Sequence, residues 1–172
     1  MAGGTLPITT HPLQAFVTEP LKPFLDKTIS SANLHFYTYQ TDRGELVIGG
    51  GVDPFPSYSQ RSTLGQHEQL AAHTLLLFPF LKEINVLRQW SGLCDMTPDY
   101  APILDEAPGV AGLVLTVGWG TWGFKAAPIA GTCIAELIAT GQPPELIRPF
   151  SMKRFLNNHL VNERASAPSA AI

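Results

Sequence analysis

A glycine-rich stretch at residues 118–123, Gly-Trp-Gly-Thr-Trp-Gly, separates an apolar run from a segment that carries a lysine. The run Leu113-Val114-Leu115-Thr116-Val117 predicts a strand, and Phe124 to Ala139 predicts a helix because its apolar residues recur every three or four positions. The first backbone N–H groups of a helix have no partner inside it, so such a turn can bind an anion or an electron-rich ligand atom. This strand, turn and helix are the first candidate binding site.

The spacing of Gly118, Gly120 and Gly123 formally matches the G-x-G-x-x-G pattern of dinucleotide-binding turns. That pattern belongs to a strand–helix–strand unit with an acidic residue ~20 residues further on, at the end of the next strand. Here the helix leads instead into Gly141-Gln142-Pro143-Pro144, and two tryptophans separate the glycines. We therefore interpret the match as misleading.

Lys125 lies in the first turn of the expected helix, where the helix dipole disfavours a cation. A lysine at an arbitrary position usually extends into solvent or pairs with a carboxylate. Its place directly after the glycine turn favours instead a role in binding an anion, for which an ammonium group is a good point-charge partner.

The rest of the chain supplies the elements that must position this turn. Strands are expected at residues 13–17, 34–39, 45–48 and 86–93, and the main helix at residues 62–81 with an interruption near Pro79. Thr41-Asp42-Arg43-Gly44 joins the second and third strands as a hairpin, and Gly49-Gly50-Gly51 is expected to end the third. The pattern predicts an α+β fold with a mixed, largely antiparallel sheet and a long helix.

Composition excludes several classes of function. The chain of 172 residues has a net charge of −3 and scattered Lys and Arg residues, so nucleic acid is not expected as a partner. No apolar run reaches the ~18 residues of a membrane span, and the N-terminus lacks the pattern of a secretory signal. Cys94 and Cys133 are far apart without metal-ligand spacing, which predicts no metal site and a reduced, cytoplasmic setting.

The histidines lack partners at the spacing of metal sites or catalytic triads, so we interpret them as structural. They include His11, expected on an edge strand, and His67 on the polar margin of the main helix.

The segment from Gly118 to Pro128 resembles the flavin-contacting segment of sarcosine oxidase β subunits and other members of the D-amino-acid oxidase superfamily. Upstream, Arg88 to Asp99, which ends in the T-P-D turn, and the following Pro102-Ile103-Leu104 resemble the same family in order and spacing. Further matching blocks, such as His11-Pro12-Leu13-Gln14, extend the resemblance over about residues 3 to 160.

The resemblance implies roles for the residues of the turn. In the family the flavin ring lies against this turn, and the lysine of the G-F-K triplet, here Lys125, holds the substrate carboxylate. The implied cofactor-binding residues are Gly118, Trp119, Gly120, Thr121, Trp122, Gly123 and Phe124. The implied function is FAD-dependent oxidation of the C–N bond of sarcosine or a related secondary or N-methyl amino acid, followed by imine hydrolysis. The resemblance leaves open which of these amino acids is the substrate and which electron acceptor is used.

Two departures from the family pattern affect these expectations. Trp122 stands where relatives commonly have a small residue, which would narrow the pocket. The cysteine that anchors flavin covalently in monomeric sarcosine oxidases is replaced by Gly92, and Cys94 is two residues away. Cys94 is either an alternative anchor or a small buried thiol; we favour the buried thiol, and hence a noncovalent FAD.

Family members begin with a nucleotide-binding strand, turn and acidic residue, and no such segment precedes these blocks. We therefore expect the C-terminal portion of such a subunit, with a substrate-binding domain at residues 3–105, a flavin-contacting segment of the FAD domain at 106–160, and a disordered tail at 161–172. The last strand and helix should then expose apolar surface. The resemblance also implies a hetero-oligomeric oxidase with an FMN in the full assembly; the alternative is a noncatalytic or truncated subunit that acts only with a separate nucleotide-binding chain.

Overall fold

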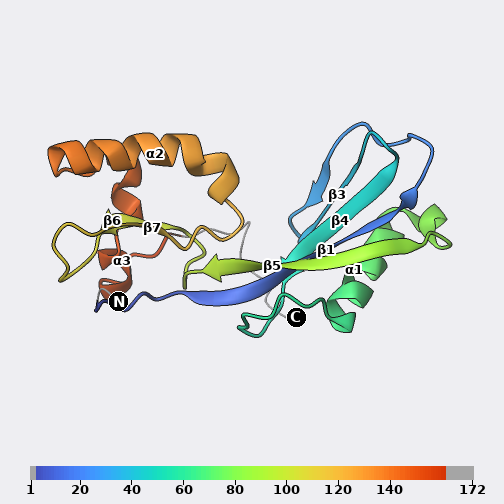
Figure 1. Ribbon diagram of the computed structural model, residues 1–172, viewed down its shortest axis with the longest axis horizontal. Helices are drawn as coiled ribbons and strands as arrows, with labels where there is room; N and C mark the ends of the chain where they lie inside the picture. The colour runs from blue at the N-terminus through green and yellow to red at the C-terminus, as the bar shows by residue number, and fades with distance from the viewer. Residues whose placement is uncertain (1–2, 162–172) are drawn as a thin grey trace. The chain divides into compact units, whose positions relative to one another are not determined.

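A computed structural model describes residues 3–161 of the chain (Figure 1). Its helices and strands, in chain order, are β1 (Thr9–Pro20), β2 (Ile29–Ser31), β3 (Phe36–Gln40), β4 (Glu45–Val52), α1 (Leu64–Leu77), the 3₁₀ turn η1 (Pro79–Leu81), β5 (Val86–Met96), β6 (Ile103–Glu106), β7 (Val114–Val117), α2 (Gly123–Thr140), the 3₁₀ turn η2 (Glu145–Phe150) and α3 (Lys153–Leu156). The expected main helix and its interruption near Pro79 are confirmed by α1 and η1. The predicted tail lies outside the described residues, apart from Val161.

The strands form two sheets within the described part of the chain. The larger has the order β2-β3-β4-β1-β5, and the smaller pairs β6 with β7. The pairs β2–β3, β3–β4, β4–β1 and β6–β7 are antiparallel, which confirms the α+β class and the largely antiparallel sheet. The expectation that His11 lies on an edge strand is wrong, because β1 lies between β4 and β5.

The described residues divide into two compact units. We call residues 11–93 the sheet unit, and residues 3–10 with 94–161 the α2 unit. The sequence placed a boundary at residues 105 and 106 instead. The observed boundary lies earlier in the chain, before Cys94. One reason is that β6 pairs with β7 as a hairpin, with Ile103 opposite Val117, which keeps the residues before 106 with the C-terminal segment. Assignment of substrate binding and flavin contact to separate segments stays a prediction.

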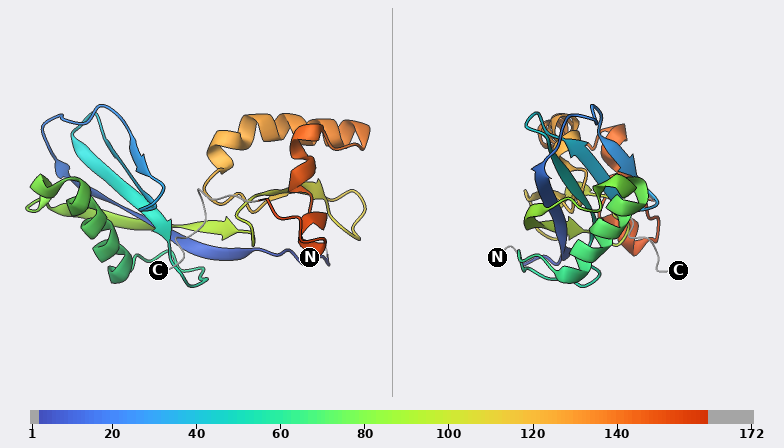
Figure 2. Two further views of the ribbon diagram at one scale, coloured as in Figure 1. Left: turned by 180° about the vertical axis from the view of Figure 1, so that it is seen from behind. Right: turned by 90° about the vertical axis from the view of Figure 1, so that its right-hand side faces the viewer.

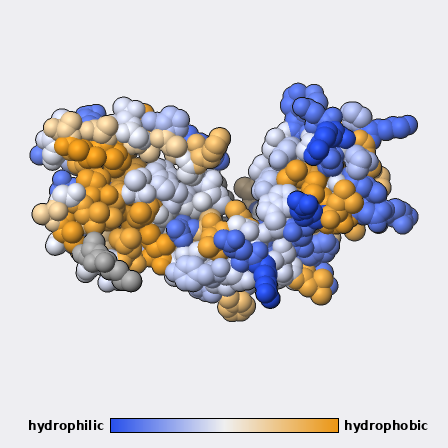
Figure 3. Space-filling model, in the orientation of Figure 1, coloured by the Kyte–Doolittle hydropathy of each residue, from blue (hydrophilic) through white to orange (hydrophobic). Residues whose placement is uncertain are grey.

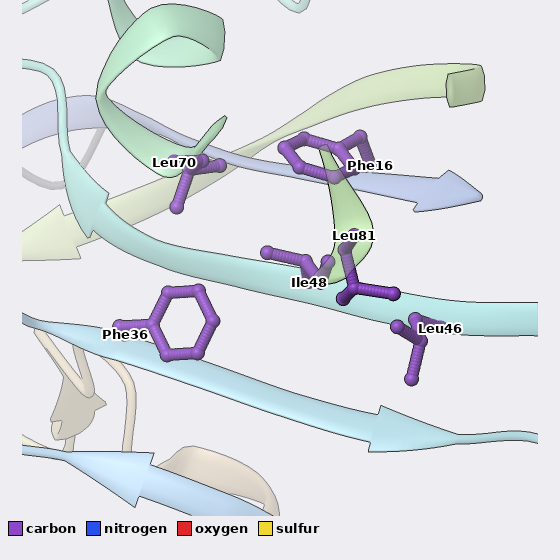
Figure 4. Packing of buried hydrophobic residues seen from close by; sticks show 6 residues of the cluster. All are labelled: Phe16, Phe36, Leu46, Ile48, Leu70 and Leu81. Carbon is purple, nitrogen blue, oxygen red and sulfur yellow. The ribbon is translucent and has the colours of Figure 1, made fainter. Parts of the chain in front are cut away.

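The core of the sheet unit lies between α1 and one face of the sheet (Figure 4). Its buried members are Phe16, Phe36, Leu46, Ile48, Leu70 and Leu81. Leu46 and Ile48 alternate along β4 and so point to the same face, where Leu70 of α1 meets them. The same alternation of burial runs along β1, whose register against β4 is thereby fixed.

The glycines of β4 allow other parts of the sheet unit to approach its backbone closely. The strand continues through Gly49-Gly50-Gly51, and the expectation that these glycines end it is wrong. Gly50 has φ +138°, and a Cβ atom there would lie 1.8 Å from the carbonyl oxygen of His35. A Cβ atom at Gly49 would lie 2.5 Å from the hydroxyl of Tyr37. The strand therefore continues only because these positions have no side chain.

The α2 unit has its own core, in which α2 packs against β7 and η2 (Figure 2). Its buried members are Leu104, Cys133, Leu137 and Ile147. The helix ends at Gly141, whose φ of 69° is the left-handed conformation that favours glycine at this position.

A buried ion pair joins the turn after β5 to the last described elements of the α2 unit. The Nε and Nη2 atoms of Arg154 donate to the two oxygens of Asp99, at 2.7 and 2.9 Å. Arg154 also donates to the carbonyls of Ala101 and Phe150, and the N–H of Val161 donates to Asp99. The two residues are only 4% and 5% exposed. A buried pair is tolerated when its hydrogen-bonding groups are satisfied, and this one is.

The glycine requirement at position 50 can be tested with one substitution at two sites. We expect Gly50→Ala to lower the free energy of unfolding by more than about 1 kcal/mol, because alanine strongly disfavours this φ and its methyl would meet a backbone carbonyl. Gly65→Ala is the control: the position lies in α1 with open space around it, and alanine should add about 0.4–1 kcal/mol of stability. Urea titration followed by circular dichroism measures both. Equal effects at the two positions would contradict the close approach.

The Asp99–Arg154 pair predicts a pH dependence of stability. Burial raises the pKa of the Asp99 carboxyl, but hydrogen bonds from Arg154 and Val161 and the Arg154 charge together lower that pKa below its ordinary value. The unfolded chain then binds more protons, so this contribution is complete above the ordinary Asp pKa of ~3.9 and is lost as the pH falls through the lowered value of the folded state. We expect the urea concentration at the unfolding midpoint to decrease as the pH is lowered below about 4. In Asp99→Asn this decrease with pH should be less steep. The control is Asp26→Asn, whose carboxylate is exposed; a slope unchanged by Asp99→Asn would refute the prediction.

Candidate functional site

The glycine turn connects β7 to α2 and packs on the last two residues of β5 and on Thr97, which follows it, all within the α2 unit. Gly118 and Gly120 have φ of +69° and +52°, a left-handed conformation that glycine adopts without steric cost. A Cβ atom at Gly118 would lie 2.5 Å from Cγ2 of Thr97, and one at Gly120 would lie 3.2 Å from Sδ of Met96. Both positions therefore favour glycine for its left-handed conformation, and Gly118 also needs it because the Thr97 methyl leaves no space for a side chain.

Hydrogen bonds hold the turn on the same segment. The N–H of Gly120 donates to the carbonyl of Asp95 at 3.0 Å, and the N–H of Trp122 donates to the carbonyl of Trp119 at 3.0 Å. The Asp95 carboxylate in turn accepts a hydrogen bond of 2.6 Å from Oγ1 of Thr10. Sequence reasoning picked out the T-P-D turn but missed that residues 95–97 form the base of the glycine turn, since no local pattern reports contacts across more than 20 residues.

The N-terminus of α2 has the properties expected of a ligand-binding helix end. The N–H of Ala126 donates to the carbonyl of Trp122, so the N–H groups of Gly123, Phe124 and Lys125 precede the first intrahelical bond. Nε1 of Trp122 is a buried donor without a hydrogen-bond partner among the described residues. Phe124 is 98% exposed. A buried donor is normally paired and a large aromatic is normally covered, so both features fit a ligand or chain segment that docks here.

Lys125 lies in the first turn of α2, where the sequence placed it. Its side chain is exposed, and its Nζ atom lies 4.1 Å from the centroid of the Trp122 ring. This cation–π contact keeps the ammonium beside the glycine turn. The turn residues and the lysine are thus brought together, while their roles toward flavin and substrate stay predictions. Thr121, the remaining polar side chain of the turn, is exposed.

An apolar groove of about 310 Å³ lies beside the turn, within the α2 unit. Its walls come from α2, from the turn residues Trp119 and Trp122, from residues 100–104 and from η2. Figure 3 shows hydrophobic residues gathered over this part of the molecule. Ile129 and Ile138 of α2 are also 51% and 66% exposed. The expectation that the last helix exposes apolar surface is confirmed by α2. For the last strand it is wrong, because the exposed residue of β7 is Thr116, while Val114, Leu115 and Val117 are buried or half-buried.

Cys94 is a buried thiol, as the sequence interpretation favoured. It is 3% exposed, and its Sγ lies 3.6 Å from Sδ of Met96. Burial, with a smaller contribution from the Asp95 charge, raises the pKa of the thiol to about 11. At neutral pH the group is protonated, and a thiol in that state is a poor nucleophile.

The side chains of His11 and His67 take part in contacts inside the sheet unit. Nδ1 of His67 lies 3.0 Å from Oε1 of Gln89, and Nδ1 of His11 lies 2.8 Å from the carbonyl oxygen of Asp53. Residues 3–161 contain no group of three or more His, Cys, Asp or Glu residues that could hold a metal ion. Across that same range, no helix has both the length and the apolar character needed to span a membrane.

The chain is similar in sequence and in structure to known oxidoreductases. The chain is 43% identical over 164 residues to a sarcosine oxidase subunit beta of Rhizobium meliloti, covering 95% of this chain and 39% of that protein. It is 44% identical over 167 residues to a sarcosine oxidase subunit beta of Rhodobacter capsulatus, covering 97% of this chain and 40% of that protein. The L-proline dehydrogenase of P. horikoshii has a similar structure, with a TM-score of 0.82 and 26% identity over 92% of this chain and 43% of that one.

The chain thus spans about two fifths of the length of these curated relatives. A family model described as FAD dependent oxidoreductase matches residues 1–137, most of the 172 residues. On this match, and on the identity to the two sarcosine oxidase subunits, the chain belongs to the FAD dependent oxidoreductase family.

Proposed function

We propose that this chain is the substrate-side portion of an FAD-dependent oxidoreductase that oxidises the C–N bond of sarcosine or a related secondary or N-methyl amino acid. The observation that carries the proposal is the glycine turn with Lys125 at the start of α2, in a chain whose relatives are named sarcosine oxidase subunit beta. A glycine-rich turn at a helix N-terminus, with a cation in the first turn of that helix, suits a flat aromatic ring and a carboxylate.

The residues of the turn fit a flavin. Residues 118–124 would contact it, because the left-handed glycines turn the chain directly into α2, where the N–H groups that precede the first intrahelical bond lie at the end of the turn. The unpaired Nε1 of Trp122 and the exposed ring of Phe124 supply a donor and an apolar surface for contact outside the described residues. A bound FAD supplies an acceptor for the hydride equivalent that leaves the carbon beside the substrate nitrogen.

Lys125 would orient the substrate in this arrangement. Its ammonium would pair with the substrate carboxylate, a charge-assisted contact that fixes one end of a small amino acid. The contact with the Trp122 ring limits the positions of the long side chain, so that less conformational entropy is lost when the substrate binds. The contact between Lys125 and the carboxylate would fix one end of the substrate, and the turn would fix the flavin. Together they would orient the substrate nitrogen toward the flavin.

Several finer features belong to the same proposal. The protonated, buried thiol of Cys94 supports noncovalent attachment of FAD. The relatives' name, subunit beta, supports assembly with other subunits, where an FMN is compatible with a second flavin site. The two free cysteines suit a reducing, cytoplasmic setting. The match covers 39% of the Rhizobium meliloti relative. This coverage is also compatible with the alternative, a noncatalytic or truncated subunit that works only with a separate nucleotide-binding chain.

The proposed function is tested by flavin content and substrate-dependent reduction. We expect the protein that contains this chain in its complete assembly to show the visible absorbance of an oxidised flavin, released by mild denaturation because attachment is noncovalent. Anaerobic addition of sarcosine, dimethylglycine or proline should bleach that absorbance for at least one of them. A colourless assembly after incubation with FAD would refute the proposal. A flavin that none of the three reduces would favour the noncatalytic alternative.

The role of Lys125 predicts a defect in substrate binding. We expect Lys125→Ala to raise the apparent KM for the amino acid by a factor on the order of 10–100, the loss of a charged hydrogen bond of ~1.5–3 kcal/mol. Thermal stability should hardly change, because the side chain is exposed. Lys153→Ala, at another exposed lysine of the α2 unit, is the control. Steady-state kinetics with unchanged KM and kcat would remove Lys125 from the site.

A further inference from the structure

We propose that Arg154 is a positioning residue for the glycine turn, acting through Asp99 and Thr97 without touching the turn itself. The expected effect on flavin binding rests on the proposed function, whereas the effect of Arg154 on the conformation of the turn does not. It arises from a chain of buried contacts that begins in α3 and ends at Gly118.

The first step is the fixed geometry of the Arg154 guanidinium. The side chains of Arg154 and Asp99 are 3% and 1% exposed, and the two hydrogen bonds between them are parallel, as in a fork. Nη1 also donates to the carbonyls of Phe150 and Ser151, at 2.9 and 3.2 Å. The guanidinium plane, and hence the Asp99 carboxylate, is therefore held in one orientation.

The same ion pair also orients the loop after β5, through hydrogen bonds to Ala101 and Thr97. Arg154 Nη2 and Thr97 Oγ1 both donate to the carbonyl of Ala101, each at 2.7 Å. The Asp99 carboxylate also accepts from the Ala101 N–H at 3.3 Å, and it lies 3.1 Å from Thr97 Oγ1, whose one proton is shared between this carboxylate and the nearer Ala101 carbonyl. Tyr100, between these anchors, has φ +60°, a conformation uncommon for a residue with a side chain. Such backbone persists only where surrounding contacts determine it, and here Arg154 and Asp99 provide them.

The fixed side chain of Thr97 in turn packs directly against the glycine turn. Thr97 is 3% exposed, and its Cγ2 methyl occupies the space that a side chain at Gly118 would need. The hydroxyl of Thr97 donates its one proton to the Ala101 carbonyl and the neighbouring Asp99 carboxylate, so the rotation that would move the methyl away from Gly118 breaks this shared hydrogen bond. The backbone of Gly118 therefore lies where the Arg154 network places Thr97.

The use of an ion pair at this place supports a positioning role. A buried pair often adds little net stability compared with apolar residues of the same volume, because both charges lose their hydration. Its hydrogen bonds are directional, however, whereas apolar contacts tolerate small rotations. A pair with every group satisfied therefore selects one arrangement of residues 97–101, and with it one arrangement of the turn.

The experiment compares Arg154→Met and Arg154→Lys with Lys153→Met, an exposed neighbour in α3. Amide hydrogen exchange of the whole chain, without flavin, reports the turn through the N–H groups of Gly120 and Trp122. We expect Arg154→Met to speed exchange there by about tenfold or more, with α2 residues 133–140 much less affected. Arg154→Lys should rescue only part of the protection, since lysine cannot form the fork. Uniformly faster exchange through the α2 unit would show a merely structural role and overturn the proposal.

A milder variant covers the case in which Arg154→Met does not fold. Thr97→Ser keeps the hydroxyl and removes the methyl that lies against Gly118, so the fold should persist while the turn loosens. In the complete flavin-containing assembly we expect the affinity for FAD to fall by about tenfold or more and the visible band to shift, since a small misplacement of binding groups has large effects. Unchanged affinity and spectrum in folded Thr97→Ser would also overturn the proposal. If the parent assembly binds no flavin, the proposed function fails, and hydrogen exchange of the turn still decides the role of Arg154.

Discussion

The methyl group of Thr97 lies where a side chain at residue 118 would be, and this contact between two distant parts of the chain sets the geometry around it. Gly118 must lack a Cβ atom, its φ must be positive, and the chain must then turn toward α2. Gly120 also has a positive φ, lies close to the Met96 side chain and donates a hydrogen bond to the Asp95 carbonyl. The start of α2, and so the position of Lys125, follows from backbone packed directly on residues 95–97.

The α2 unit and the sheet unit use different physical means to fix their backbones. In the sheet unit the alternation of buried residues along β1 and β4 sets the register, and apolar packing against α1 holds it. In the α2 unit the loop after β5 is fixed by the buried Asp99–Arg154 pair. An ion pair is weak as a source of stability but strong as a determinant of direction, which suits a segment that has to present a turn in one conformation.

The apolar surface of the α2 unit connects the fold to the family. The groove beside the turn, the exposed ring of Phe124 and the unpaired Nε1 of Trp122 lie within one short stretch of chain. The curated relatives are about two and a half times as long as the matched part, and the family is defined by its use of FAD. Surface of this kind is expected where a cofactor and further protein pack against the turn.

The sequence by itself determined the local features of this protein. Helical spacing predicted α1 and α2, and the glycines and Lys125 marked the candidate site. Alternating aromatics predicted β3, and the hairpin connection after it predicted β4. The strand β6 was missed, because its four residues, Ile-Leu-Asp-Glu, lack the continuous apolar run that marked the equally short β7, and its pairing depends on the hairpin across Ala107 and Leu113. Only the tertiary structure decided that Asp99 meets Arg154, 55 residues away, and that Thr97 underlies Gly118. Contacts between distant residues depend on how elements pack and on buried groups finding partners, and neither is encoded in the spacing of neighbouring residues.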